Sequence, residues 1–85
     1  MQPDSDESWA TANIHVRLYG ILREKLPPTG RAVLSLPPGS TISDVIDRLA
    51  ITGNVQTAVN GQIKPLDTIL ADGDTVEIFR AAAGG

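Results

Sequence analysis

The sequence predicts an α+β fold, in which one helix packs on one face of a small mixed sheet of four or five strands. Three observations support this prediction. The chain has 85 residues, enough for one small domain. Several short segments alternate apolar and polar residues, as half-buried strands do. Only residues 42–49 place apolar residues at the spacing of an amphipathic helix.

The composition excludes several classes of function. The chain is 41% hydrophobic and 20% charged, which is typical of a globular domain. It contains no cysteine, so disulfides, zinc–thiolate sites, iron–sulfur clusters and thiol catalysis are excluded. Its single histidine, His15, alternates with core residues and is interpreted as a surface residue, so no metal site is expected. A net charge of −3 argues against a nucleic-acid partner, and no segment has the length of a membrane span.

Residues 1–13 are expected to form a disordered acidic leader. They include Asp4, Asp6 and Glu7 but no lysine or arginine. They lack the basic start and apolar run of a secretory signal, so the predicted location is the cytoplasm. Trp9 is the one leader residue with a large apolar surface, and the sequence does not say where it packs.

The ordered domain is expected over residues 14–80 and begins with two strands, 14–19 and 31–36. The Pro-Pro-Thr-Gly turn at 27–30 separates them, which suggests a hairpin. Alternation assigns the following residues to the core: Ile14, Val16, Leu18, Ala32, Leu34 and Leu36.

A helix should follow Pro37-Pro38-Gly39, because proline cannot donate a hydrogen bond to a sheet. Ser40 or Thr41 can cap its N-terminus. Gly53-Asn54 is the expected stop. The buried stripe of this helix consists of Ile42, Val45, Ile46 and Leu49.

The second half of the domain is expected to contain strands at 55–59 and 75–80 and a short return strand at 62–64. Asn60-Gly61 is a strong hairpin signal, since both residues accept positive φ. The last strand should lie beside the first, with Val76 and Ile78 directed inward. Leu66, Ile69 and Leu70 are also expected to be buried.

A tight turn is the favoured interpretation of Asp72-Gly73-Asp74, in preference to a pair of metal ligands.

The final segment, residues 81–85, reads Ala-Ala-Ala-Gly-Gly. Without Cβ atoms, Gly84 and Gly85 can extend through a channel too narrow for other residues. One interpretation is a flexible tail that presents an unhindered carboxylate to an enzyme, and the other is a frayed terminus. The residues alone leave both open.

Residues 59–79, VNGQIKPLDTILADGDTVEIF, together with Gly84-Gly85 resemble the ubiquitin-like sulfur carriers of the MoaD/ThiS family. The resemblance spans residues 14–85 and implies the ubiquitin-like β-grasp fold. Residues 18–24, Leu-Tyr-Gly-Ile-Leu-Arg-Glu, are more similar to the MoaD side of the family. One departure is the three alanines at 81–83, where MoaD tails commonly carry prolines.

The resemblance implies that Gly85 is adenylated by an E1-like enzyme and converted to a thiocarboxylate, with Gly84 and Ala83 threading into the partner. ATP would be consumed by that enzyme, and the chain itself would bind no cofactor and hold no catalytic residue. The sulfur would pass to molybdopterin biosynthesis through the large subunit of molybdopterin synthase. Carriers for thiamine or cysteine synthesis, a ubiquitin-like protein modifier, and a noncovalent β-grasp interaction module remain alternatives.

Partner docking is predicted on the sheet face opposite the helix, near the start of the tail. Alternation places four residues there: Phe79, Tyr19, Val33 and Arg17. The alternative is that the leader covers them, with Trp9 on the patch. The free chain is expected to be a monomer that pairs with other proteins.

Overall fold

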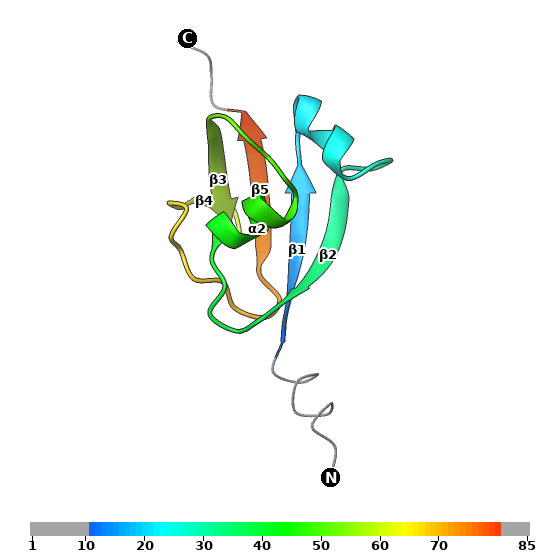
Figure 1. Cartoon of the computed structure of the whole chain (residues 1–85). Coiled ribbons are helices and arrows are strands. Elements are labelled where there is room, and N and C mark those ends of the chain that lie inside the picture. The colour runs from blue at the N-terminus through cyan, green and yellow to red at the C-terminus, as the bar shows by residue number, and fades with distance from the viewer. Residues whose placement is uncertain (1–10, 81–85) are drawn as a thin grey trace.

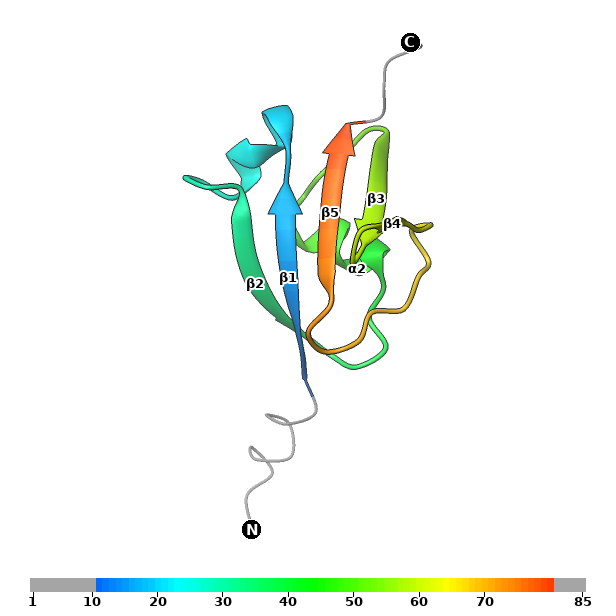
Figure 2. The ribbon, with the colours of Figure 1, turned by 180° about the vertical axis from the view of Figure 1, so that it is seen from behind.

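The computed structural model describes residues 11–80 and shows a five-stranded sheet with one α-helix on one face (Figures 1 and 2). The strand order is β2-β1-β5-β3-β4, with β1 and β5 parallel and the other neighbours antiparallel. The elements are β1 (Ala12–Leu18), η1 (Gly20–Lys25), β2 (Arg31–Leu36), α2 (Ile42–Arg48), β3 (Val55–Val59), β4 (Gln62–Ile63) and β5 (Thr75–Arg80). The predicted mixed sheet with a single packed helix is confirmed.

The first strand starts earlier than expected. We placed the boundary between leader and domain after Asn13, but β1 begins at Ala12. Ala12 is buried and pairs with Leu36, while Asn13 pairs with Ser35. The whole length of β2 therefore lies against β1 and draws two further residues into the sheet. The remainder of the predicted leader, residues 1–10, lies outside the described residues.

The connection between β1 and β2 contains a 3₁₀ helix, η1, that the sequence analysis treated only as a loop. Leu22 is the buried residue of η1 and belongs to the core. The connection closes where the Gly30 N–H donates to the Leu26 carbonyl and Leu18 N–H donates to the Gly30 carbonyl. Because only one residue of η1 is buried, the segment shows no apolar periodicity from which so short a helix could be predicted.

Helix α2 starts at Ile42, as predicted, and is capped by Thr41. The Thr41 hydroxyl accepts from the Asp44 N–H at 3.3 Å, and the Asp44 carboxylate accepts from the Thr41 N–H at 2.8 Å. This reciprocal pair is a capping box. It satisfies two backbone donors at the only α-helix in residues 11–80.

The end of α2 was predicted too late. The helix stops at Arg48, and Ala50 has a positive φ of 56°, before Gly53-Asn54 is reached. The N–H of Ile51 donates to the Ile46 carbonyl, and that of Ala50 donates to the Asp47 carbonyl. These two bonds form a Schellman motif with alanine where glycine is usual. The buried side chain of Ile51 holds this turn against the core.

The core lies between α2 and the sheet, and the predicted inward residues of the central strands are confirmed. The side chains that are almost completely inaccessible are Ile14, Val16, Ile42, Val45, Val76 and Ile78. Leu18, Leu36 and Leu70 are also buried. Within residues 11–80, no buried side-chain nitrogen or oxygen lacks a hydrogen-bond partner.

The expectation that Leu66 and Ile69 point inward is wrong, because their side chains are 45% and 68% exposed. The segment containing them is held by its backbone. The Leu66 carbonyl accepts from Ser43 N–H, and Ile69 forms a bridge with Thr41. This extended path turns alternate side chains to opposite sides, so Leu70 is buried and Ile69 is not.

The two predicted turns, at Asn60-Gly61 and Asp72-Gly73-Asp74, are both present, and a side-chain hydrogen bond joins them. Asn60 and Gly61 have φ of 51° and 87°, as the hairpin between β3 and β4 requires. Asp74 accepts from the Ala71 N–H and from the Asn60 side-chain amide, and Asp72 accepts from the Asn13 N–H. Both carboxylates thus bind donors of the fold, which supports the turn interpretation.

No helix in the part of the chain that the structure describes is long and apolar enough to cross a membrane.

Candidate functional site

The candidate site is the end of β5 and the face of the sheet that α2 leaves uncovered. The predicted reactive residues Gly85, Gly84 and Ala83 lie outside the described residues. The structure does describe the strand that precedes them, which ends at Arg80. This end of β5 lies at the same end of the sheet as η1 (Figures 1 and 2). The structure therefore describes the root of the tail, which is Arg80 with its contacts, and the surface around it.

Arg80, the last residue of β5, is held to the loop before β3. Its Nη1 donates to the Thr52 carbonyl at 2.5 Å. Gly53 follows with a φ of +88°, and a Cβ there would lie 2.7 Å from Arg80 Nη1. A side chain at position 53 would therefore force the guanidinium group to move from its place beside Thr52. This contact and the pairing of Arg80 with Val55 fix where the chain leaves the sheet.

Next to this root, the uncovered face carries a cluster centred on Glu77. The Tyr19 hydroxyl donates to Glu77 Oε2 at 2.5 Å, and Arg17 Nη1 lies 3.9 Å from the same oxygen. The rings of Tyr19 and Phe79 meet edge to face, with centroids 6.3 Å apart and planes at 89°. The structure thus brings together three of the four predicted docking residues, and Tyr19 is 41% exposed.

Glu77 is the member of this cluster that the sequence analysis did not propose. Its signal was the register: in the parallel pair of β1 with β5, Arg17 lies opposite Glu77. Tyr19 follows two residues later on the same face. Alternation alone puts Glu77 on the uncovered face beside Arg17 and Tyr19, and the register then sets its contacts with both residues.

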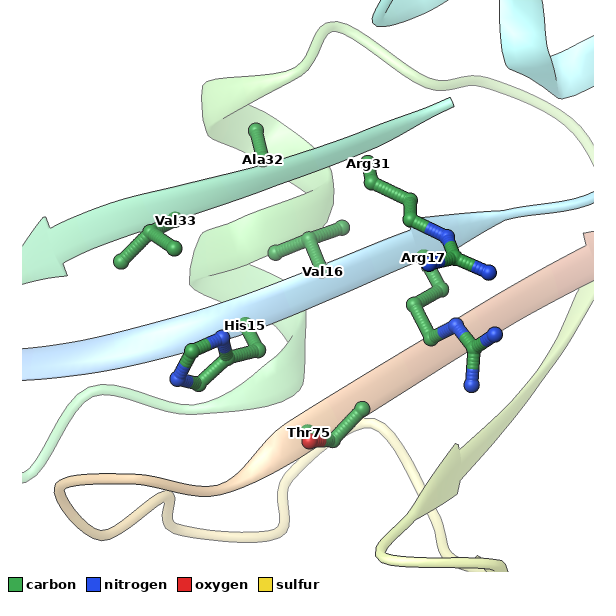
Figure 3. Close-up of a pocket in the computed structure, with 7 residues that line it drawn as sticks. All are labelled: His15, Val16, Arg17, Arg31, Ala32, Val33 and Thr75. Atoms are coloured by element: carbon green, nitrogen blue, oxygen red, sulfur yellow. The ribbon is translucent and has the colours of Figure 1, made fainter. Parts of the chain in front are cut away.

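Val33, the fourth predicted docking residue, does not join the aromatic pair. It pairs with His15, and the pair Arg17–Arg31 lies between it and Tyr19. Val33 is 56% exposed and lines a separate hollow with His15, Arg17, Arg31 and Thr75 (Figure 3). The register of β2 against β1 therefore places Val33 two rows from Tyr19.

The hydrogen bond to the Glu77 carboxylate raises the pKa of Tyr19 above its usual 10.0. Partial burial and the negative charge of Glu77 raise this pKa further, while the positive charges of Arg17 and Arg31 lower it. The hydroxyl therefore stays protonated and donates at neutral pH.

Residues 11–80 contain no group of three or more His, Cys, Asp or Glu side chains arranged to hold a metal ion. The described side chains of the site are a cation, a carboxylate and two rings on an open surface. Such a surface suits recognition by another protein.

The comparison with protein families places residues 16–85 in a match to the model of the ThiS family. The chain is 32% identical over 80 residues to the molybdopterin synthase sulfur carrier subunit of Mycobacterium tuberculosis. That alignment covers 85% of this chain and 96% of the relative.

Solved structures share the same fold. A putative molybdopterin converting factor, subunit 1, from Pyrococcus furiosus superposes with a TM-score of 0.71 and 24% identity, over 84% of this chain and 99% of its own. Small archaeal modifier protein 1 of H. volcanii superposes with a TM-score of 0.71 and 17% identity, over the same shares. The expected ubiquitin-like β-grasp fold is confirmed.

Substitution of Glu77 should lower the pKa of Tyr19. Glu77→Gln removes the carboxylate acceptor and its charge, so the tyrosinate forms at lower pH. Tyr19 is the only tyrosine, so an absorbance titration of tyrosinate reports it alone. In the wild-type chain the folded-state pKa lies above the unfolded value. The hydroxyl thus contributes stability that is complete below about pH 10 and is lost as the pH rises through the folded-state pKa.

The control for this titration is Glu24→Gln, which neutralises a carboxylate on η1 that does not contribute to the shift. Equal titration curves for Glu77→Gln and the wild-type chain would contradict the hydrogen bond.

Gly53→Ala should destabilise the fold more than Gly39→Ala. Both glycines have a φ of +88°, which costs an alanine about 1–2 kcal/mol. A Cβ at position 39 has open space, whereas one at position 53 displaces the Arg80 guanidinium. The additional cost is the lost hydrogen bond to Thr52, about 1 kcal/mol. Urea unfolding measures both variants, and in an Arg80→Ala background the difference between them should vanish.

Proposed function

Since the chain belongs to the ThiS family, we propose that it is a sulfur carrier whose C-terminal Gly85 is activated by an E1-like enzyme and converted to a thiocarboxylate. The observation that carries this proposal is the extent of the family match, which runs from residue 16 through residue 85 and so includes Gly84-Gly85. The family and the fold are established, and the chemistry at the tail is the inference drawn from them.

The proposed reaction uses a terminal carboxylate as its nucleophile. A carboxylate oxygen of Gly85 attacks the α-phosphorus of ATP, and pyrophosphate leaves. The resulting acyl adenylate makes the carboxyl carbon electrophilic, so a sulfur nucleophile can form a C–S bond there while AMP departs. Both steps belong to the partner enzyme, which consumes the ATP. This chain contributes the carboxylate and the surface by which it is recognised, and we propose that it has no catalytic activity of its own.

The residues of this chain suit that role in two ways. Gly84 and Gly85 lack side chains, so the carbonyl carbon is open to attack from either side. Arg80 ties the strand before the tail to Thr52. We infer that this rigid root lets a partner locate the reactive carboxylate from the position of the folded domain.

Molybdopterin biosynthesis is the acceptor pathway we propose. Support comes from the Mycobacterium tuberculosis relative, since the alignment covers nearly its whole length at 32% identity. The partner would then be the large subunit of molybdopterin synthase, in the cytoplasm. Thiamine synthesis is the second candidate, because the matching family model carries the name of that branch.

We propose that partners dock on Tyr19, Phe79 and Arg17. Tyrosine, phenylalanine and arginine are the residue types enriched at protein interfaces. These three surround Glu77 next to the end of β5, so a partner that binds them also approaches the tail.

The central test is the intact mass of the protein after incubation with ATP, a sulfur source and the E1-like enzyme of the same organism. The expected result is a gain that matches replacement of one oxygen by sulfur. Deletion of Gly85 should abolish the gain, because the shortened tail no longer reaches the adenylation site. The matched control is Ala82→Ser, which keeps the length and both glycines. An unchanged mass with a competent activating enzyme would contradict the carrier function.

Truncation of Phe79 should weaken recognition without changing the chemistry. Phe79→Ala is expected to raise the KM of the activating enzyme for this chain about fivefold or more, the effect of an interface residue worth over ~1 kcal/mol, with little change in kcat. Ile63→Ala is the control, since Ile63 is exposed on β4 away from the tail root. Tyr19→Ala provides a second variant if Phe79→Ala unfolds. Equal KM values for the three variants and the wild-type chain would place the docking surface elsewhere.

A further inference from the structure

The uncovered face contains a second feature, a hollow of about 400 Å³ that shares only Arg17 with the proposed docking cluster. It spans three adjacent strands, β2, β1 and β5 (Figure 3). His15 lies at its centre, with Val33 opposite on β2 and Thr75 opposite on β5. The next row along the sheet holds Arg17 and Arg31, and in Figure 3 their guanidinium groups extend to the same side of the sheet. Helix α2 lies behind the sheet in this view.

The hollow holds positive charge that the described residues leave largely unneutralised. Arg17 and Arg31 are direct cross-strand partners, an arrangement that destabilises a sheet when nothing compensates it. Glu77 is the carboxylate nearest to Arg17, at 3.9 Å, and it also accepts the Tyr19 hydroxyl. No ion pair within residues 11–80 joins Arg31 to a carboxylate. Paired guanidinium groups of this kind bind carboxylates.

The complementary charge lies in the same chain, just before β1. Asp4, Asp6 and Glu7 account for three of the ten acidic residues, so the remaining seven balance the seven basic ones. The whole net charge of −3 thus belongs to residues 1–10, which contain no lysine or arginine. These residues lie outside the described ones, and only their sequence enters the argument.

The length of this segment is sufficient to reach the hollow. From Thr11 back to Asp4 is seven residues, which can span about 23–25 Å. Along β1 the distance from Ala12 to Arg17 is five residues, or about 17 Å.

We propose that the acidic segment at residues 4–9 binds in this hollow within the same chain, with its carboxylates on the Arg17–Arg31 pair. Trp9 follows the carboxylates in the sequence, and the exposed Val33, which pairs with His15, offers it an apolar contact within the hollow. Individual ion pairs at a surface are weak, so binding requires the three carboxylates and the apolar contact of Trp9 together, with the segment held close to the hollow by the short connection through Thr11.

One consequence rests on the proposed function. Arg17 belongs both to the hollow and to the surface proposed for partner docking. A segment bound to Arg17 competes with a partner for that residue, so the acidic segment tunes the affinity of the carrier for its partners. Binding in the hollow is itself independent of the sulfur chemistry.

Trp9 is the only tryptophan, so its fluorescence reports the segment without a label. In the full chain, raising NaCl to about 1 M shortens the Debye length to about 3 Å and should shift the emission to longer wavelength as the segment is released. The triple variant Asp4→Asn, Asp6→Asn, Glu7→Gln should show the released spectrum at low salt. Its amide NMR signals should differ from those of the wild-type chain at His15, Val33 and Thr75.

Arg31→Gln removes one guanidinium group that has no ion pair among the described residues, so the fold should persist. It should reduce the ratio of bound to released segment by up to about fivefold, the effect of one exposed ion pair. Arg48→Gln, on α2 and so away from the uncovered face, is the matched control and should leave the emission unchanged. Identical spectra for Arg31→Gln and the wild-type chain would overturn the proposal. An emission that varies with protein concentration would also overturn it, by assigning the hollow to a second copy.

Neither readout involves the activating enzyme. A chain that accepts sulfur but shows no Trp9 response would refute the segment proposal alone. The opposite result would refute the carrier function and leave the segment proposal standing.

Discussion

The parallel pairing of β1 with β5 is the constraint on which the rest of the structure depends. It joins the two ends of the domain in the middle of the sheet, with Val16 beside Val76 and Leu18 beside Ile78. All four side chains are buried, and each contributes about 1.5–3 kcal/mol through removal of apolar surface from water. The turn before β5 is bonded to β1 as well, since Asn13 binds Asp72 and Gly73. Without this pair, β2 and the β3–β4 hairpin would belong to separate sheets and would not pack around one core.

The same pairing decides which chemistry each face of the sheet carries. Because the side chains alternate, the residues between the buried ones on both central strands point away from α2. Arg17 then meets Glu77, and Tyr19 meets Phe79, close to where β5 ends. The surface proposed for recognition and the root of the tail are thus consequences of a single register. The face toward α2 remains apolar and forms the core.

Periodicity was sufficient to predict most of the fold. The β5 strand, the Asn60-Gly61 hairpin and the Thr41 helix start followed from alternation, turn chemistry and capping, all of which are local. The predictions that proved wrong concerned residues whose positions depend on contacts distant in the sequence. Ile69 is exposed because its segment pairs with the start of α2, and Val33 lies away from Tyr19 because of the register after η1. Helix α2 ends early because Ala50, just after it, adopts a positive φ. No sequence pattern predicts this conformation for a residue other than glycine.

The proposed function requires an enzyme to find one carboxylate at the end of a short segment. Prolines before the terminal glycines would restrict the path of that segment, because proline fixes φ. This chain has alanines at 81–83, which impose no such restriction. The direction in which the tail starts then depends on the last residue of β5. Arg80 supplies that control through its bond to Thr52 over Gly53, where any larger residue would collide with the guanidinium group. We therefore infer that a partner locates the start of the tail from Arg80 and its contact with Thr52.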